Sequence, residues 1–192
     1  MKIEKITLNA INESKWSGGT TSEYFIYPKG SSVQAQDFDF RISTACIEVE
    51  ASTFTKFPNH DRILLILEGQ TEIIHRDKYS KQLKKFDLEY FPGNYDTSSS
   101  SIGKVKDFNL IYDVKYSANV EVFKGVLNFK KTIQQKQWMF IFNYNGDLTL
   151  QYSNEFYTIE SNEMLILCNE NNPQDFYLKG NAQSLISTIK LK

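Results

Sequence analysis

The stretch RILLILEGQTEIIH, residues 62–75, consists of an apolar run, a polar residue, a glycine and a second apolar run. The stretch WMFIFNYNGDLTLQY, residues 138–152, repeats this order around a glycine of its own. Further along each copy, KQLKKFDLEYF (81–91) matches YTIESNEMLIL (157–167) at almost the same offset as the one between the two glycines. A near-constant spacing over two segments indicates that one structural unit occurs twice in the chain.

The repeated units have the pattern of short β-strands. Apolar runs of four to ten residues, rich in Ile, Val, Thr, Phe and Tyr, are bounded by turn residues along the whole chain. No helical periodicity is sustained for about 10 residues, and the 11 Tyr and 14 Phe favour a pleated surface. We therefore predict an all-β protein with two packed β-barrel units, residues 1–115 and 116–192, between which strands can be exchanged. A single irregular sandwich is the alternative.

Two segments carry more local expectations. Residues 62–69 have no polar face, so their strand is expected to be covered on both sides, as between two barrels. Thr97–Ser101 is a run of small polar residues between the copies and predicts a loop.

Composition excludes several classes of function. The 22 basic and 23 acidic residues give a net charge of -1, without the clustered basic excess that nucleic acid requires. No apolar run approaches the roughly 20 residues that span a bilayer, and the N-terminus lacks the apolar core of a signal peptide. Cys46 and Cys168 lie far apart in apolar stretches, which predicts reduced core residues of a cytoplasmic protein.

Arginine and histidine are confined to the first half of the chain. Lysine accounts for 19 of the 22 basic residues, and the three arginines are Arg41, Arg62 and Arg76. Both histidines, His60 and His75, fall in the same part of the chain. Chemistry that needs an imidazole or a planar guanidinium must therefore be carried by the first half.

Five segments, in this order, resemble the HutD/Ves family of bicupins and together cover most of the chain from its start to Tyr112. The segments are KWSGGTTSE (15–23), FDFRISTACIE (38–48), FTKFPNHDRILLILEG (54–69), FPGNY (91–95) and GKVKDFNLIY (103–112). The resemblance implies two jelly-roll cupin units in one chain and no established enzymatic activity. Some relatives are linked to histidine utilisation, where they are thought to sense or limit a breakdown intermediate.

The sequence departs from the commoner family pattern in its first segment. Trp16 and Ser17 stand where Asn and Gly are usual, and Ser22 stands where Arg is often found. If that arginine contributes to a ligand site in relatives, the site in this chain is different.

A metal site is not expected, because three or four well-placed ligands are needed. In residues 57–69 the only imidazole is His60, and Arg62 is cationic. Glu68 lies eight residues beyond His60, roughly 26 Å along a straight strand. His75 belongs to the following strand. His60 is kept as a candidate ligand-binding residue, with a hydrogen-bonded structural role as the alternative.

Arg41 and Arg62 are the stronger candidates, because a guanidinium inside a strand is costly unless an anion neutralises it. The anion is either an internal carboxylate or a carboxylate-bearing ligand, which the planar fork of arginine fits. Candidate internal carboxylates are Glu48, Asp61, Glu68 and Asp107. In the ligand-binding hypothesis Thr21, Ser43 and Asn109 orient the ligand, Asp107 anchors the arginines from behind and Trp16 supplies an apolar wall.

The glycines of WSGGTTSE permit either an anion-binding nest or a simple turn before the next strand.

The first functional hypothesis is a non-enzymatic bicupin that binds a small carboxylate metabolite and regulates amino-acid catabolism. It requires no metal or cofactor and no nucleic-acid or membrane partner, and it leaves a homodimer open. The second hypothesis is a metal-independent isomerase or lyase that uses His60 in acid–base chemistry. The third is a protein-interaction module whose barrels are filled by side chains.

Overall fold

The computed structural model describes all residues from 1 to 192 and consists almost entirely of strands. The only helical segment has three residues, so no helix of the protein could cross a membrane. The elements are β1 (Lys2–Ile6), η1 (Leu8–Ala10), β2 (Asn12–Trp16), β3 (Gly19–Tyr27), β4 (Phe40–Ile47), β5 (Ala51–Thr53), β6 (His60–Glu68), β7 (Gln70–His75), β8 (Tyr79–Lys84), β9 (Leu88–Pro92), β10 (Thr97–Ser101), β11 (Val105–Asp113), β12 (Tyr116–Ile133), β13 (Gln137–Tyr152), β14 (Glu155–Ile159), β15 (Glu163–Asn169) and β16 (Gln174–Leu191). The predicted all-β fold class is confirmed.

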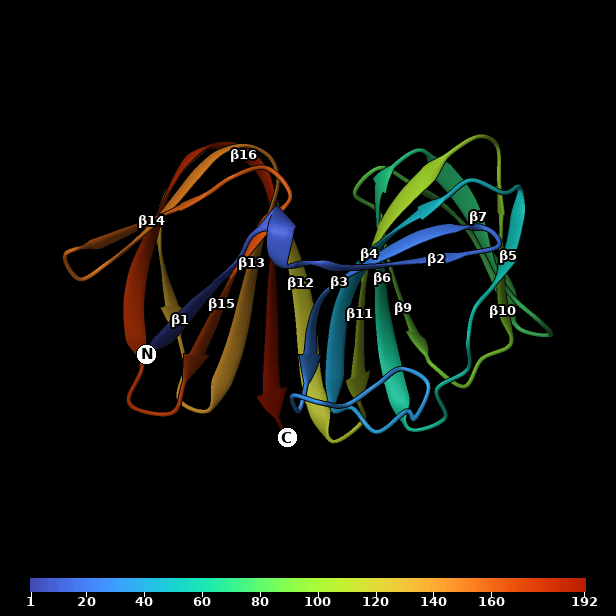
Figure 1. Ribbon diagram of the computed structural model, residues 1–192, viewed down its shortest axis with the longest axis horizontal. Coiled ribbons are helices and arrows are strands. Elements are labelled where there is room, and N and C mark those ends of the chain that lie inside the picture. Colours follow the sequence, from blue (N-terminus) through green and yellow to red (C-terminus); the bar gives the residue numbers. More distant parts are fainter. The chain divides into compact units, whose positions relative to one another are not determined.

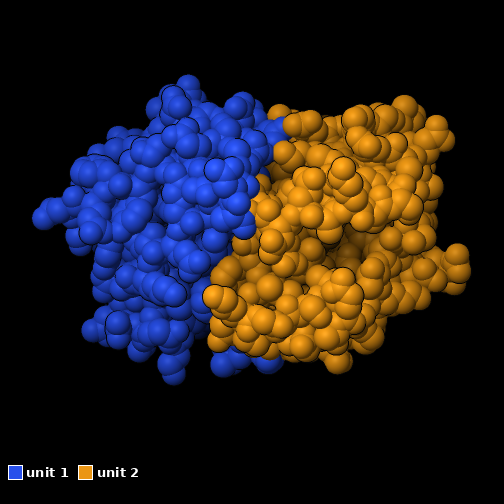
Figure 2. Space-filling model, viewed as in Figure 1, with its two compact units in different colours: residues 1–10, 115–192 blue, residues 11–114 orange.

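The chain divides into two compact units, which Figure 2 shows in different colours. Unit 1 comprises residues 1–10 and 115–192, and unit 2 comprises residues 11–114. The first ten residues therefore belong with the C-terminal part of the chain and not, as predicted, with residues 11–115. The physical reason is strand pairing, since β1 runs antiparallel to β15 with Lys2 opposite Cys168.

Unit 1 contains one six-stranded sheet with the order β1-β15-β13-β16-β12, to which β14 is added through β13 (Figure 1). Its interior is filled by apolar side chains, among them Ile141, Leu165 and Ile186, none of which is exposed. Each such side chain contributes about 1.5–3 kcal/mol to folding when it is removed from water.

Unit 2 contains two sheets (Figure 1). The larger sheet has the order β2-β3-β4-β11-β6-β9, and the smaller one has the order β5-β10-β7-β8. Leu64 and Val105 of the larger sheet share an apolar cluster with Ile73 and Leu83 of the smaller sheet. Unit 2 is therefore a β-barrel-like sandwich with an apolar layer between its sheets.

Strand β6, which lies between β11 and β9 in the larger sheet, is buried on both faces. Residues 63–67 of β6 are at most 1% exposed, although successive side chains point to opposite faces. The continuous apolar run therefore has the predicted cover on both sides.

Two corresponding turns support the internal duplication. In unit 2 the backbone N–H of Lys84 donates to Asp87 Oδ2 at 3.0 Å, and in unit 1 the N–H of Glu160 donates to Glu163 Oε2 at 2.9 Å. The strands that follow occupy equivalent places, since β9 pairs with β6 and β15 pairs with β13. Both turns use the same local chemistry, at the positions that the sequence repeat matches to one another.

The predicted loop at Thr97–Ser101 is wrong, because these residues form β10 between β5 and β7. Their side chains alternate between buried and more exposed positions. Hydroxyl groups make this burial possible, since Ser101 Oγ donates to Thr71 Oγ1 at 2.8 Å and Thr71 Oγ1 donates to the Ser100 carbonyl at 3.0 Å.

Candidate functional site

Unit 2 contains a cavity of about 560 Å³, and the space-filling view shows a hollow on the face of this unit turned to the reader (Figure 2). This volume is typical of sites for small molecules. Strands β2, β3, β4, β6 and β11 contribute to the lining, together with residues 31–34 and 53–57. The lining includes Trp16, Thr21, Glu23, Arg41, Phe57, Arg62, Asn109 and Ile111.

Strand register places the polar residues of the larger sheet on one face. Ile111 of β11 lies opposite both Arg62 of β6 and Arg41 of β4. Asn109, two residues before Ile111 on β11, lies opposite Ser43 of β4. Asp107, two residues before Asn109, points to the same face of the sheet. Alternation along three neighbouring strands thus brings both arginines, Ser43, Asp107 and Asn109 together inside unit 2.

Arg62 is the buried cation of the cavity. Its side chain is 4% exposed, and its Cζ lies 4.9 Å from the ring centre of Phe57 and 5.4 Å from that of Phe54. Nη2 donates to the Thr55 carbonyl at 2.5 Å, whereas Nε is buried without a hydrogen-bond partner. No carboxylate lies within ion-pair distance, so the guanidinium retains donors for an anion in the cavity.

The charge of Arg62 persists in this environment. Burial, against the opposing charge of Asp107 and together with the nearby charge of Arg41, lowers the pKa of Arg62 to about 10. The guanidinium is therefore still cationic at neutral pH.

Arg41 has a different environment, although it lines the same cavity. Its Nε pairs with Glu23 Oε2 at 2.6 Å, and its Nη1 donates to Ser43 Oγ at 3.0 Å. The internal ion pair considered from the sequence therefore exists at Arg41, with Glu23 as its anion. This carboxylate was not among those expected, although residue alternation on β3 could have indicated that Glu23 shares a face with Thr21.

Asp107 and Asn109 add acceptors without partners. The Oδ1 atoms of both residues are buried and make no hydrogen bond. Asp107 is 6% exposed, and burial raises the pKa of its carboxyl to about 7 against the opposing effects of a hydrogen bond from Ala45 and the two nearby arginines. Unpaired polar groups in an interior are costly, and they concentrate at functional sites.

Five of the eight predicted site residues line the cavity: Trp16, Thr21, Arg41, Arg62 and Asn109. Ser43 touches the cavity only through Arg41, and Asp107 lies deeper in the barrel. Trp16 stands on the edge strand β2, and its ring covers Gly18, where an added Cβ would come within 2.2 Å of the indole. Gly18 and Gly19 form the tight turn between β2 and β3. This agrees with the interpretation of WSGGTTSE as a simple turn before the next strand.

His60 lies outside the cavity lining. Its Nε2 is 2.8 Å from the carbonyl oxygen of Phe38, and its ring is packed 4.5 Å from the ring of Phe38 and 5.9 Å from that of Phe57. This residue is 5% exposed and holds the segment before β4 against β6. The geometry corresponds to the hydrogen-bonded structural role.

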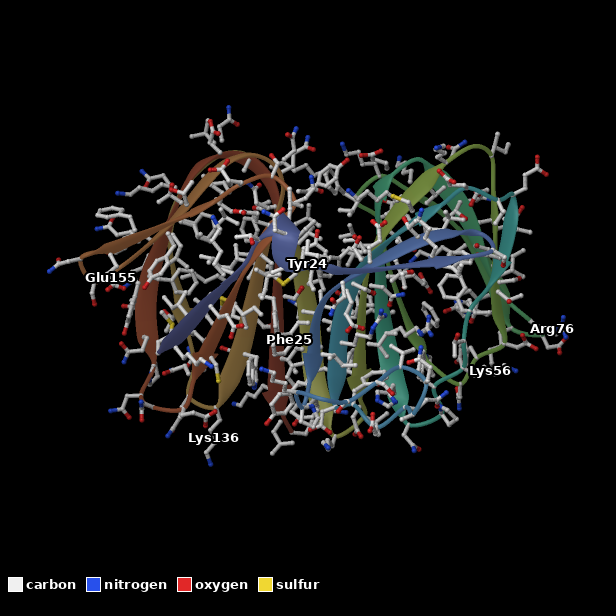
Figure 3. The ribbon with its side chains drawn as sticks, in the orientation of Figure 1. Tyr24, Phe25, Lys56, Arg76, Lys136 and Glu155 are labelled. Atoms are coloured by element: carbon white, nitrogen blue, oxygen red, sulfur yellow. The ribbon has the colours of Figure 1, made fainter.

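The remaining arginine and histidine are also accounted for. Arg76 extends outward from unit 2 (Figure 3) and lies 3.5 Å from Asp96. His75 is buried with its Nδ1 2.9 Å from Thr97 Oγ1, and burial lowers its pKa. Beside it Glu89 accepts a hydrogen bond from Tyr79 at 2.8 Å and pairs with Lys81. Neither residue lines the cavity.

The HutD family model matches residues 8–186. The chain belongs to the HutD family. This membership confirms the resemblance seen in five segments of the first half and extends it through the second half, where no distinctive motif was found. No curated protein matches the sequence of this HutD-family chain.

Solved structures share the fold of this HutD-family chain. The conserved protein of unknown function PA5104 from Pseudomonas aeruginosa PAO1 has a TM-score of 0.87 at 17% identity, and HutD from Pseudomonas fluorescens SBW25, in a formate condition, has 0.83 at 19%. In both cases all of each chain is covered. The match to the bacterial pirin YhhW from Escherichia coli, in complex with nickel(II), covers 99% of each of the two chains and has a TM-score of 0.69 at 10% identity. These likenesses confirm the bicupin fold.

Proposed function

We propose that the protein is a non-enzymatic binding protein for a small carboxylate metabolite, and that it takes part in regulating amino-acid catabolism of the histidine type. The observation that carries the proposal is Arg62, a cavity-lining guanidinium that is 4% exposed and has no protein carboxylate. A ligand carboxylate would neutralise this charge and accept the free guanidinium donors. Family membership supports the regulatory part of the proposal.

The other cavity residues suit a small ligand with one carboxylate. Arg41 is already neutralised by Glu23, so a single guanidinium remains for the ligand. Thr21 and Asn109 offer neutral hydrogen bonds, and Trp16 offers an apolar surface. This combination of one charged anchor, a few polar groups and an aromatic wall is the usual composition of a metabolite site.

An isomerase or lyase reaction has less support. Its proposed acid–base group, His60, is bonded to the Phe38 carbonyl and lies outside the cavity lining. A catalytic base has to come within hydrogen-bond reach of its substrate. The binding function is therefore preferred.

The test is a thermal-shift screen of small carboxylic acids, including intermediates of histidine degradation, against the wild-type protein and Arg62→Ala. We expect at least one acid to stabilise the wild type, since a ligand that binds only the folded state raises the melting temperature. The shift should be lost in Arg62→Ala. Arg76→Ala is the matched control, because Arg76 is exposed and lies outside the cavity.

A screen in which no carboxylate stabilises the wild type would refute the proposal. The proposal would also be refuted if an acid stabilised Arg62→Ala as much as the wild type, because the ligand would then bind elsewhere.

A further inference from the structure

The charges inside unit 2 do not favour the simple addition of an anion, and this inference rests on the proposed carboxylate site. The pair between Arg41 and Glu23 is neutral. Arg62 and Asp107 remain, and they also sum to zero when Asp107 is ionised. A bound carboxylate would then leave one uncompensated negative charge in the interior, which is strongly unfavourable.

Protonation of Asp107 removes this difficulty. With a neutral Asp107 the buried groups carry one net positive charge, that of Arg62, and a ligand carboxylate cancels it. Asp107 and Arg62 do not form an ion pair, and each has a buried polar atom without a partner, namely Oδ1 and Nε. The protein itself therefore leaves both groups incompletely satisfied.

A small internal cavity of about 20 Å³ lies next to Asp107. Its lining includes the hydroxyl-bearing residues Thr71, Ser99 and Ser101, so it can hold one water with several polar partners. Ser99 Oγ lies 2.8 Å from Ser52 Oγ, and both residues line a second surface groove of unit 2, which shares Trp16 and Thr53 with the lining of the ligand cavity. The small cavity therefore lies between the Asp107 carboxyl and hydroxyl-bearing residues of β7 and β10, of which Ser99 also lines the second groove.

We propose that the site binds a carboxylate together with one proton, and that this proton is held on Oδ1 of Asp107. The ligand stays ionised and pairs with Arg62, while solvent supplies the proton to the Asp107 carboxylate. In the absence of ligand at neutral pH, the proton is only partly bound, since burial raises the pKa of Asp107 to about 7.

Other titratable groups in unit 2 do not supply the proton. Glu23, on β3, pairs with Arg41 of β4, and Glu89, on β9, pairs with Lys81 of β8. His75 of β7 has its pKa lowered by burial, so it is neutral at pH 7. The residues that β7 and β10 contribute to the small cavity beside Asp107 carry only hydroxyl groups or apolar side chains.

Proton uptake gives binding a definite pH dependence. A ligand anion near Asp107 raises the pKa of that carboxyl, and reciprocity requires the protonated site to bind the ligand more tightly. Below pH 7 Asp107 already holds its proton, so affinity is constant. Above pH 7 the apparent dissociation constant rises about tenfold per pH unit, until the pKa of the complex is reached.

The experiment uses formate, the smallest carboxylate and one that stays ionised from pH 5.5 to 8.5. Binding is followed through the indole N–H signals of the two tryptophans in NMR titrations of the full chain. Trp16 lines the cavity, whereas Trp138 lies on β13 of unit 1 and serves as the internal reference. In the wild type we expect the dissociation constant to be flat below about pH 7 and to rise steeply above it. In Asp107→Asn it should be independent of pH.

A second measurement does not depend on a substituted protein. The pKa of the Asp107 carboxyl, read from its ¹³C signal in the wild type, should increase when formate saturates the site.

The outcomes separate the two proposals. If formate moves the Trp16 signal with the same affinity at every pH, or if the Asp107 pKa is unchanged by formate, proton uptake is refuted while carboxylate binding stands. A pH dependence that persists in Asp107→Asn also refutes it. If neither formate nor acetate moves the Trp16 signal at any pH, the carboxylate site itself is refuted, and proton uptake with it.

Discussion

Arg41 and Arg62 lie on either side of Ile111 on the inward face of one sheet, yet their surroundings give them different roles. Glu23 neutralises Arg41, so this arginine mainly joins β4 to β3. Arg62 is held by the Thr55 carbonyl and two aromatic rings, none of which carries a negative charge. A planar cation fixed in this way has its binding geometry set before a ligand arrives, which lowers the entropic cost of binding.

The same buried carboxyl that tunes the site should also affect folding stability. In the unfolded chain Asp107 ionises near pH 4, whereas in the folded protein burial raises its pKa to about 7. Between these values the unfolded state loses its proton first, so the contribution of Asp107 to stability falls as the pH rises from about 4 to 7.

We therefore predict that Asp107→Asn becomes more stable relative to the wild type over this range, by a few kcal/mol in total, with no further change above pH 7. Urea unfolding of both proteins at pH 4.5, 6 and 8 measures this difference. A difference in unfolding free energy that does not vary between pH 4.5 and 8 would contradict the assignment.

Much of this site could be predicted from residue alternation, and the rest could not. Alternation along β4 and β11 correctly groups Arg41 with Ser43 and Asp107 with Asn109. The partner of Arg41 depends on the register between β3 and β4, which contains a bulge between Glu23 and Phe25 that no sequence pattern specifies. The structural role of His60 is not predictable in the same way, because a histidine before a strand gives no sign of which carbonyl will receive its hydrogen bond.

At the scale of elements, the turns before β9 and β15 provide a matched comparison. Asp87 and Glu163 each accept a hydrogen bond from the backbone N–H three residues earlier, and Glu163 also pairs with Lys5 of β1 at 2.6 Å. Loss of a turn hydrogen bond of this kind costs about 1 kcal/mol. The two turns differ because only the one in unit 1, through Glu163, also forms an ion pair with a further strand, β1.

We predict that Asp87→Ala lowers the unfolding free energy by about 1 kcal/mol and that Glu163→Ala lowers it further, because it also removes the ion pair to Lys5. Asp87→Asn and Glu163→Gln are the controls, since an amide oxygen can still accept the hydrogen bond. Chemical denaturation measures all four. Equal losses for the two alanine variants would show that the pair to Lys5 contributes nothing.

The element pattern also shows where strand prediction fails. Strands β6 and β13 can be predicted from their apolar runs, because a strand that is buried on both faces requires a continuous hydrophobic sequence. Strand β10 reads TSSSS and lacks this signal. It is a strand because β5 and β7 pair with it on both sides and because its hydroxyls find partners, and both conditions belong to the tertiary structure.

At the scale of the whole molecule, the chain crosses between its units at both ends of unit 2. Residues 1–10 and 115–192 form one unit, so unit 2 is a continuous insertion at residues 11–114. Duplication of a unit predicts two barrels, but it does not predict which barrel receives the first strand. That choice depends on the free edge of β15, which β1 covers.

Deletion of residues 1–7 should therefore destabilise unit 1 and leave the ligand cavity of unit 2 intact. It removes β1 from the edge of β15, and with it Met1 and Ile3, which pack against the apolar core of unit 1. We expect the NMR signal of Trp138 to shift, because Trp138 lies opposite Cys168, the residue that Lys2 also faces. The Trp16 signal and its response to formate should be unchanged. The opposite pattern, with Trp16 altered and Trp138 unaffected, would place the first strand with the ligand-binding unit, because only a strand that supports unit 2 could affect the cavity when it is removed.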